Sequence, residues 1–371
     1  MKKKVIISVT SDLVTDQRVH KVSQTLHNNG YDVLLVGRKL PTSLPMDERK
    51  YRTKRFKLWF HKTALFYLNY NLRLFFFLLF KRTDILLAND LDTLPANYLV
   101  SVIRNKPLVY DSHEYFTGVP ELQHRQRVRK IWERIEGFIF PKLNYVYTVN
   151  DSIAGLYGEK YQKQIQVVRN VPYYQETETT DLFPEKKILV YQGSGINVNR
   201  GAEELVLAMR YLQPQEFNLW IVGGGDVFES LKKIAADEQL TDRINFINKV
   251  PFSQLQEITR KAQLGLSFDK PTNVNYLYSL PNKVFDYLHA GLPILTTRLP
   301  EIEAVQEKFN TGFFIDHHEP LHIADRIKYM FEDQSRYLGW KKNTAAAAKA
   351  YCWQNEEKTI LAIFNEIAGR R

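Results

Sequence analysis

The chain has 371 residues, of which 44% are hydrophobic and 25% are charged, proportions typical of a globular protein with room for two domains. Its one cysteine excludes an internal disulfide, and no Cys/His spacing typical of a zinc site occurs. Residues 1–12 lack the apolar core of a signal peptide, so we expect a cytoplasmic location. The net charge of +10 is uneven, since residues 1–170 carry +13 and residues 171–371 carry −3.

The first half alternates between short apolar runs, which predict strands, and amphipathic stretches, which predict helices. The predicted strands are 5–9, 33–36, 85–88, 108–110 and 145–149. The helices predicted between them include 18–29, 64–80, 93–103 and 127–140. This rhythm is typical of a parallel sheet that is covered by helices.

The second half repeats the same alternation. Its predicted strands are 188–192, 217–222, 244–247, 264–267, 293–296 and 311–314. Its predicted helices include 201–211, 227–238, 253–261, 320–333 and 353–367. Residues 171–184 are polar, acidic and flanked by prolines, so they predict a linker or a surface loop between the two halves.

We therefore predict an α/β protein with two Rossmann-like, doubly wound domains that face a cleft. The predicted boundaries are 1–172 for the N-terminal domain, 173–184 for the linker, 185–350 for the C-terminal domain and 351–371 for a last helix. Ligands of open parallel sheets bind beyond the carboxyl ends of the strands. Polar residues that directly follow a strand are therefore candidate site residues.

Two basic clusters, 49–57 and 125–134, could attract acidic lipid headgroups, nucleic acid or an anionic substrate. Between them, residues 65–80 hold the densest aromatic content of the chain, but their uninterrupted apolar part is shorter than the ~20 residues of a membrane span. We expect a buried helix there. A helix that lies in the bilayer surface is the alternative, and two faces of one helix could serve both. No nucleic-acid-binding motif is visible, so nucleic acid is not an expected partner.

In the first half, two loops after predicted strands carry polar residues. The loop after strand 5–9 contains Asp12, Asp16 and Arg18, which could face a ligand, although Asp16 could instead cap the next helix. This loop lacks the Gly-x-Gly-x-x-Gly fingerprint of a dinucleotide-binding domain. After strand 108–110, His113 lies beside Asp111 and Glu114 and could donate to a sugar hydroxyl or a phosphate, because its pKa lies near physiological pH.

In the second half, a Gly-rich turn joins a strand to a helix. Gly193 and Gly195 let the backbone approach a ligand closely, and Arg200 could bind two phosphate oxygens with its planar guanidinium. The turn is not a Walker loop, because no Gly-Lys-Ser/Thr follows. Lys249 and Val250 follow strand 244–247, where backbone amides could bind the edge of a base.

The segment 278–295 predicts a loop, a short helix and a buried strand. Asn282, Lys283 and Asp286 are spaced three and four apart, so we expect them on one helix face, opposite an apolar face that includes Val284. A helix N-terminus with an added lysine suits a phosphate, and the Asp286 carboxylate could accept hydrogen bonds from ribose hydroxyls. The alternative is that Lys283 and Asp286 form a simple exposed ion pair.

Together these motifs resemble those of the GT-B glycosyltransferases, in particular the retaining family 4-like group. The turn from Gly193 to Gly201 is similar to the diphosphate-binding turn of that family, and the segment 222–225 to the Val-Gly-x-Gly that follows it. Counting back from Gly291, the two acidic positions of the family correspond to Tyr278 and Asp286. Asp286 keeps its carboxylate, whereas Tyr278 is a departure, since a phenol cannot carry the same charge at pH 7.

His113 resembles the histidine in the first-domain His-Glu pair of this group, and Ser194 stands where an arginine often follows the first glycine. The resemblance implies a hexosyltransferase that moves a sugar from a nucleotide-diphosphate sugar to a lipid-linked or surface-glycan acceptor with retention, and a last helix, 351–371, that crosses back to the N-terminal domain. Arg200 and Lys283 would stabilise the leaving phosphate, so we expect neither a metal nor a cofactor.

The residues expected to act fall into three groups. The catalytic candidates are His113, Arg200, Lys283 and Asp286. The donor-binding candidates are Gly193, Ser194, Gly195, Lys249, Val250, Tyr278, Pro281, Asn282 and Val284. The acceptor-binding candidates are Asp12, Asp16, Arg18 and Glu114. We expect the basic N-terminal domain to bind the acceptor and to contact an anionic membrane at its inner face, in polysaccharide biosynthesis.

Two other functions remain open. One is a nucleotide-sugar epimerase or hydrolase on the same fold, for which Asp111, His113 and Glu114 would supply acid/base groups. The other is a catalytically inactive homologue that binds a membrane or a polyanion, in which case Tyr278 would mark a lost active site.

Overall fold

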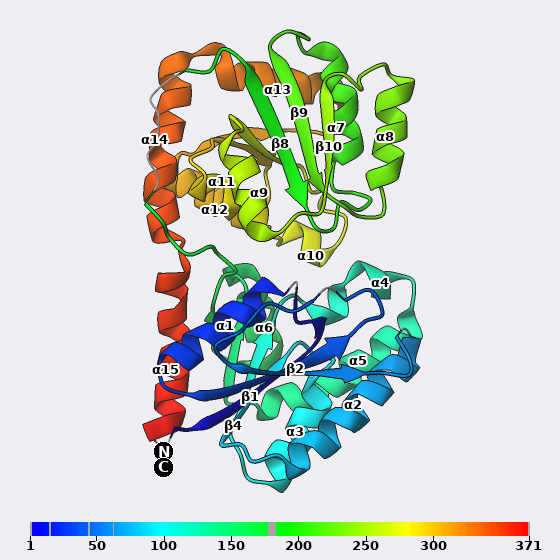
Figure 1. Cartoon of the computed structure of the whole chain (residues 1–371), viewed down its shortest axis with the longest axis vertical. Coiled ribbons are helices and arrows are strands. Elements are labelled where there is room, and N and C mark those ends of the chain that lie inside the picture. The colour runs from blue at the N-terminus through cyan, green and yellow to red at the C-terminus, as the bar shows by residue number, and fades with distance from the viewer. Residues whose placement is uncertain (1, 15, 44, 62, 177–182, 370–371) are drawn as a thin grey trace. The chain divides into compact units, whose positions relative to one another are not determined.

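The computed structural model describes residues 2–14, 16–43, 45–61, 63–176 and 183–369. These residues form two compact units, each with its own sheet (Figure 1). Unit 1 comprises residues 1–170 and 356–371, and unit 2 comprises residues 171–355. The boundaries expected from the sequence were 172/173 and 350/351. The middle of the expected linker, residues 177–182, lies outside the described residues.

Unit 1 contains a seven-stranded sheet in the order β3-β2-β1-β4-β5-β6-β7, and all neighbouring strands are parallel. Its strands are β1 Lys4–Asp12, β2 Asp32–Lys39, β3 Arg52–Lys57, β4 Ile85–Asn89, β5 Leu108–Ser112, β6 Tyr145–Thr148 and β7 Gln166–Val167. The strand order reverses between β1 and β4. In open parallel sheets this reversal opens a crevice at the carboxyl ends of the two strands, where ligands bind.

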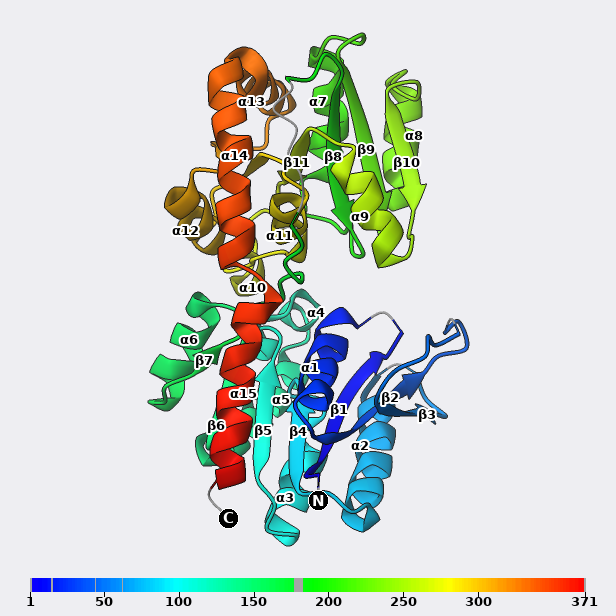
Figure 2. The same ribbon diagram turned by 60° about the vertical axis from the view of Figure 1, so that its left-hand side comes forward.

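The helices of unit 1 cover both faces of this sheet. They are α1 Gln17–Asn28, α2 Thr63–Phe80, α3 Leu94–Ile103, α4 Pro120–Gln123, α5 Gln126–Ile139, α6 Asp151–Tyr161 and most of α15 Trp353–Gly369. In Figure 2, α1 and α15 lie in front of the sheet, whereas α2 and α3 lie behind it. The last helix packs against the first part of the chain through a T-shaped contact of Phe364 with Tyr31, at 5.6 Å between ring centroids, and a hydrogen bond from Thr25 to Glu357.

The basic cluster 49–57 contains an edge strand that the sequence pattern did not predict. In β3, residues Arg52–Lys57 are mostly exposed or half-buried, and only Phe56 is buried. A charged edge strand lacks the apolar run that identifies inner strands, and charge at an edge discourages pairing with another chain. Residues 52–57 of this basic cluster are therefore an ordered strand.

Helix α2 differs from the expectation of a buried helix. Only 22% of its residues are buried, although by length and composition alone it could cross a membrane. The buried side chains are Phe66, Tyr70, Leu74 and Leu78, each four residues from the last. The Tyr70 hydroxyl donates to the Val9 carbonyl of β1 at 2.6 Å, so one stripe of the helix is fixed on the sheet. The expectation of a buried helix is wrong, because the other faces of α2 remain exposed.

Unit 2 contains a six-stranded parallel sheet in the order β10-β9-β8-β11-β12-β13. Its strands are β8 Lys187–Gly193, β9 Phe217–Gly223, β10 Ile244–Asn248, β11 Leu264–Ser267, β12 Ile294–Thr297 and β13 Gly312–Ile315. Its helices are α7 Ala202–Ala208, α8 Phe228–Asp237, α9 Phe252–Arg260, α10 Val274–Leu277, α11 Asn282–His289, α12 Pro300–Phe309, α13 Pro320–Glu332 and α14 Gln334–Ala350. The strand order reverses between β8 and β11, so the loops after these two strands adjoin the usual ligand position of such sheets.

Candidate functional site

In unit 2, the two cations expected to bind phosphate share one carboxylate. The Arg200 guanidinium lies 2.8 Å from one carboxylate oxygen of Asp269, and the Lys283 ammonium lies 3.7 Å from the other. Asp269 is fully buried and directly follows β11, next to the point where the strand order reverses. The two side chains therefore converge, and Lys283 does not form the simple exposed pair with Asp286 that was the alternative.

Aromatic rings also contact both cations. The Arg200 guanidinium lies over the Tyr276 ring at 4.5 Å, and the Lys283 ammonium lies over the Tyr191 ring at 4.2 Å. Burial lowers the pKa of Lys283, with the charge of Asp269 acting in the opposite direction. For Arg200, burial opposes the charged form, but Asp269 outweighs it and the pKa is raised. Two cations against one carboxylate leave this spot with local positive charge.

Two glycines of unit 2 allow close backbone contacts beside the Gly-rich turn. Gly201 has φ 72°, and a Cβ there would lie 2.5 Å from the Phe268 carbonyl oxygen. Gly223 has φ 136°, and a Cβ there would lie 1.8 Å from the Gly193 carbonyl oxygen. Only glycine fits both the positive φ and the close approach. The contact of Gly201 with Phe268 places Arg200 beside Asp269.

Asp286 belongs to a separate hollow of unit 2. Its carboxylate accepts a hydrogen bond from the Gln192 amide at 3.1 Å, and Thr259 donates to the Gln192 carbonyl oxygen at 2.7 Å. The hollow lies between α9, α11 and the start of the unit. It is lined by Pro172, Tyr173, Gln175, Gln192, Phe252, Leu255, Gln256, Thr259, Arg260, Asp286, His289 and Ala290. Asp286 and Lys283 therefore have different partners, although both belong to α11.

The other donor candidates are exposed or half-buried, with one exception. Ser194 is exposed in the Gly-rich turn, and Asn282 is exposed at the start of α11, which Pro281 precedes as N-cap. The Lys249 side chain lies over Gly224, since a Cβ there would be 3.1 Å from the Lys249 Cε. Gly195, Val250 and Tyr278 are half-buried.

The exception is Val284, which we remove from the donor-binding set. Its side chain is fully buried in the core with Phe285 and Leu288. Its backbone N–H donates to the Pro281 carbonyl at 3.0 Å. Neither the side chain nor this N–H is offered to a ligand.

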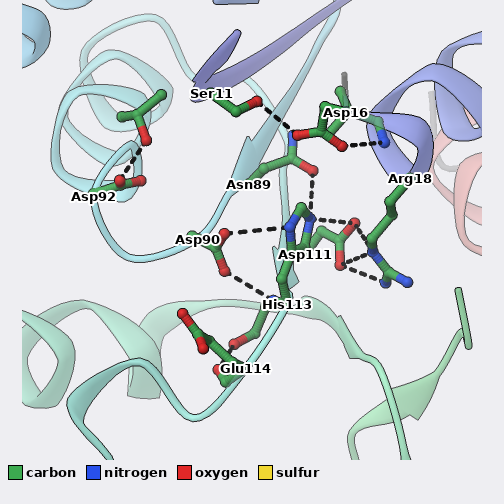
Figure 3. A network of polar contacts seen from close by, with 12 residues as sticks. Ser11, Asp16, Arg18, Asn89, Asp90, Asp92, Asp111, His113 and Glu114 are labelled. Carbon is green, nitrogen blue, oxygen red and sulfur yellow. Dashed lines mark hydrogen bonds and ion pairs between the residues drawn. The ribbon is translucent and has the colours of Figure 1, made fainter. Parts of the chain in front are cut away.

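In unit 1, a polar network forms at the carboxyl ends of β4 and β5 (Figure 3). One His113 ring nitrogen lies 3.3 Å from an Asp90 oxygen, and the other lies 3.3 Å from Asp111 and 3.1 Å from the Asn89 amide oxygen. The His113 backbone N–H donates to Asp90 at 2.8 Å. The imidazole thus lies between two carboxylates and is 21% exposed.

Arg18 is a buried part of this network and is not available to a ligand. Its guanidinium binds both Asp111 oxygens, at 2.6 and 3.0 Å, and donates to the Val168 carbonyl at 2.7 Å. The side chain is 4% exposed. Its assignment to the acceptor is therefore wrong, because its donors are used within unit 1.

The two aspartates of the first loop also have internal partners. Asp16 caps α1 by accepting from the Val19 N–H at 3.1 Å, as its alternative interpretation held, and it accepts from Ser11 at 2.6 Å. Asp12 lies 3.5 Å from Arg55 of β3. Both remain half-buried at the carboxyl end of β1.

The network has unusual protonation. Burial disfavours the His113 cation, but Asp90 and Asp111 outweigh it and raise the His113 pKa to about 9. Burial followed by the Asp90 charge raises the pKa of Glu114 to about 8 and that of Asp92 to about 7. Burial acts against the Asp111 charge, yet Arg18 and His113 lower its pKa to about 2. At neutral pH this edge of unit 1 holds an imidazolium between carboxylates, with a neutral carboxylic acid at Glu114.

Sequence reasoning missed several residues of these sites, namely Asp269, Tyr191, Tyr276, Gln192, Thr259 and Asn89. Asp269 could have been found, because it follows a correctly predicted strand and the search was for polar residues at that position. Gln192 and Thr259 could not, because their hydrogen bonds depend on the packing of α9 against β8. Within the described ranges, no group of three or more His, Cys, Asp or Glu side chains has the arrangement of a metal site.

Two family models match the chain. Residues 16–171 match Glycosyltransferase Family 4, and residues 175–347 match Glycosyl transferases group 1. A search of curated protein sequences found no match.

Solved structures are similar over nearly the whole chain. A glycosyltransferase from Rickettsia africae has 14% identity and a TM-score of 0.75, with 99% of each chain covered. A sucrose-phosphate synthase from Thermosynechococcus elongatus has 14% identity and a TM-score of 0.76, with 100% of each covered. Anabaena HepE in complex with UDP-glucose has 13% identity and a TM-score of 0.73, with 98% of this chain and 99% of that chain covered.

These likenesses agree with the two parallel sheets and the Gly-rich turn described above. The two family models together cover residues 16–171 and 175–347, most of the chain. The chain therefore belongs to the glycosyltransferases, as a family 4-like member with the GT-B fold.

Proposed function

We propose that this glycosyltransferase moves a hexosyl group from a nucleoside-diphosphate sugar to a lipid-linked or surface-glycan acceptor, with retention and without a metal or cofactor. The observation that carries the proposal is the convergence of Arg200 and Lys283 on buried Asp269. A diphosphate needs fixed positive charge, and a carboxylate behind two cations holds them in place before the ligand arrives. The structurally similar HepE was solved in complex with UDP-glucose, which supports a nucleotide-sugar donor.

In the proposed reaction, the bond between the anomeric carbon and the diphosphate oxygen breaks, and negative charge grows on the leaving phosphate. Arg200, Lys283 and the N–H groups at the start of α11 stabilise that charge. The acceptor oxygen forms the new bond on the same face, and its proton passes to the leaving phosphate. The ribose hydroxyls donate to the Asp286 carboxylate and replace its hydrogen bond from Gln192. Helix α7 has only seven residues and therefore a small dipole, so its N-terminus is not part of the proposed phosphate site.

Unit 1 receives the sugar and the acceptor in this proposal. His113 positions the donor sugar, and its raised pKa keeps it a cation at neutral pH. Both of its ring nitrogens already have carboxylate or amide partners, so a sugar hydroxyl must replace one of these contacts. Glu114 and Asp12 remain acceptor candidates, and the basic charge of unit 1 suits an anionic lipid-linked acceptor at the inner face of a membrane.

The test is a ligand screen followed by two substitutions. A nucleotide or nucleotide sugar that binds should raise stability by about 2.7 kcal/mol at a hundredfold excess over its dissociation constant, measured by thermal shift. With that donor, Arg200→Ala and Lys283→Ala should each lower kcat/KM by ~10²-fold or more. Arg298→Ala, which removes an exposed cation of unit 2, is the matched control and should match the wild type. Unchanged turnover in both site variants would overturn the mechanism.

Two parts of the proposal have separate readouts. Proton NMR of the product shows whether the anomeric configuration is retained. Turnover after dialysis against a chelator shows whether a metal is needed, and full activity is expected.

A nucleotide-sugar epimerase is the second candidate. The neutral Glu114 and the raised pKa of Asp92 would supply an acid/base pair in unit 1. Formation of an epimerised nucleotide sugar in the absence of any acceptor would favour this function over transfer.

A further inference from the structure

Helix α2 carries an exposed apolar stripe that nothing within unit 1 covers. Leu65, Leu68, Leu72, Phe76 and Phe80 are spaced three and four residues apart and are all exposed, with Phe80 at 81%. The opposite stripe, Phe66 to Leu78, packs on the sheet. Exposed apolar residues scattered singly are ordinary, but a stripe along about four turns of one helix is not.

Helix α3 extends this stripe into a surface. Asn71 of α2 donates to the Asp92 carbonyl and accepts from the Ala96 N–H, near the start of α3. Arg104, just after α3, donates to the carbonyls of Leu78 and Lys81 at the end of α2. The two helices therefore run parallel and in register.

Because of this register, the exposed end of α2 lies alongside exposed apolar residues of α3. We define the α2–α3 face as Leu65, Leu68, Leu72, Phe76 and Phe80 of α2 with Leu99, Val102 and Ile103 of α3, all of which are exposed. Phe138 of α5 borders it, since Tyr98 of α3 contacts its ring at 6.3 Å and Lys142 lies over it. The face therefore comprises exposed apolar residues of two helices that lie side by side.

Positive charge surrounds the α2–α3 face. The sequence from residue 49 to residue 82 contains many Lys and Arg residues and no Asp or Glu. Within α2, Arg73 lies over the Trp59 ring at 4.6 Å. At the C-terminal ends of the two helices, Lys81, Arg82 and Arg104 follow the last turns.

A hollow with basic walls adjoins the same helix. Arg52, Lys54 and Lys81 line it, together with Leu34, Thr53 and Phe77. Phe77 belongs to α2, so the hollow lies between the β3 edge and that helix. Basic side chains beside an apolar surface suit a layer whose interior is hydrocarbon and whose boundary is anionic.

We propose that the α2–α3 face binds an anionic lipid bilayer, with its leucine and phenylalanine side chains among the acyl chains and its basic rim at the headgroups. This proposal rests on the proposed function, because membrane binding would bring the enzyme to a membrane-borne acceptor. Its evidence comes from α2 and α3 and is independent of the nucleotide site. The contacts of Tyr70, Asn71 and Arg104 hold α2 on unit 1, so the helix lies along the bilayer surface and does not cross it. A second copy of the chain is a poorer occupant, because it would bring two basic rims together.

The first test is co-sedimentation of the full chain with vesicles. Binding should be strong with vesicles of phosphatidylcholine and phosphatidylglycerol and weak with phosphatidylcholine alone, and added salt should weaken it. Lys81→Gln with Arg82→Gln should lower partitioning to the anionic vesicles by about tenfold or more. The matched control removes two exposed lysines of unit 2, Lys233→Gln with Lys342→Gln, and should change binding far less.

A second pair of variants tests the apolar part. Leu72→Ser with Phe76→Ser replaces exposed side chains, so the fold should persist, and partitioning should fall by about tenfold or more. Tyr211→Ser with Leu321→Ser removes a similar exposed apolar area from unit 2 and serves as the control. Equal binding by all four variants would overturn the proposal.

Trp59 reports contact with the acyl chains directly. It is 77% exposed, whereas Trp132, Trp340 and Trp353 are buried. Brominated lipids should quench fluorescence of the wild type, and Trp59→Phe should lose most of that quenching. Quenching that survives the substitution would place another surface on the bilayer and overturn the proposal.

The outcomes separate the two proposals of this protein. If nucleotide sugars bind but vesicles do not, the α2–α3 face is wrong and the proposed function stands. If vesicles bind through this face and no nucleotide sugar binds, the reverse holds. If light scattering shows a dimer that Leu72→Ser with Phe76→Ser dissociates, without vesicle binding, the face joins two copies and the membrane proposal is overturned.

Discussion

Asp269 is a buried carboxylate that organises the proposed diphosphate site, because Arg200 and Lys283 both lie against it. Its charge lies behind Arg200 and Lys283, so it cannot repel a ligand as strongly as the two cations attract it. It also offsets the repulsion between the cations when the site is empty. At this scale the site depends on one residue whose role is visible only in three dimensions.

We predict that Asp269→Asn destabilises unit 2 by about 3 kcal/mol, because removal of one partner leaves buried charge without compensation. Urea unfolding measures the loss, and inorganic pyrophosphate should restore part of it by taking the place of the carboxylate charge. Asp316→Asn breaks an exposed ion pair with Arg326 and should cost only about 0–1 kcal/mol. A cost at Asp269 as small as that at Asp316 would contradict the organising role.

The His113 network predicts a pH dependence for unit 1. The pKa of His113 is raised from 6.5 to about 9 in the folded protein, so the native state holds this proton more tightly than the unfolded state. The resulting stability is complete below about pH 6.5 and is lost as the pH rises through about 9. The raised pKa values of Glu114 and Asp92 also make the unfolding free energy fall with rising pH, from their ordinary values of 4.5 and 3.8 up to about pH 8 and about pH 7, because burial penalises the charged carboxylates.

His113→Gln should therefore flatten the decline of unfolding free energy between pH 6.5 and pH 9, as measured by urea titrations across that range. The exposed His124→Gln is the control and should follow the wild-type curve. Parallel curves for wild type and His113→Gln would show that the imidazolium does not stabilise the fold.

At the scale of elements, most strands and helices could be predicted because inner parallel strands are apolar runs that lie between amphipathic stretches. The predicted strand 264–267 matches β11, and the predicted helix 320–333 ends one residue beyond α13. Strand β3 was not predicted, because an edge strand has little apolar sequence. Helix α14 escaped because its many alanines give it almost no apolar face to recognise.

For the candidate site, too, local sequence features could be predicted, whereas features that depend on the whole fold could not. Arg200 and Lys283 could be found because their place at strand–helix turns is a local property. Arg18 was misassigned because a sequence shows that a cation follows a strand but not that an aspartate and a carbonyl already bind it. Burial and pairing depend on the whole fold, and they decide which polar residues remain available.

The Gly-rich turn provides a test at this scale. Gly201→Ala forces a Cβ toward Phe268 at a positive φ, so it should destabilise unit 2 by about 1–3 kcal/mol and displace Arg200. Gly195→Ala is the control for stability, since its Cβ would meet only Asn197 at an ordinary 3.6 Å. Thermal unfolding and nucleotide affinity measure the two effects. Equal stability of the two variants would contradict the steric argument.

For the whole molecule, the chain leaves unit 1 at residue 170 and returns at residue 356. Unit 2 is therefore one uninterrupted stretch inserted into unit 1, and each unit has its own sheet. The two ends of unit 1 at this insertion are close together, because the Arg169 N–H donates to the Glu356 carboxylate at 2.8 Å and the Arg169 guanidinium lies 3.5 Å from it.

Unit 1 should consequently survive excision of unit 2. A chain that joins residue 170 to residue 356 through a few glycines should fold with a cooperative transition and keep α15 packed on its sheet. Circular dichroism and the exchange of amide hydrogens in α15 measure this outcome. A chain that remains unfolded would show that unit 1 requires unit 2 for its stability.

The proximity of Arg169 and Glu356 also has an evolutionary meaning. A single genetic crossover at each of these two codons would replace the whole of unit 2 while leaving unit 1 and its terminal helix intact. Under the proposed function, such an exchange would combine a new donor site with an unchanged acceptor site.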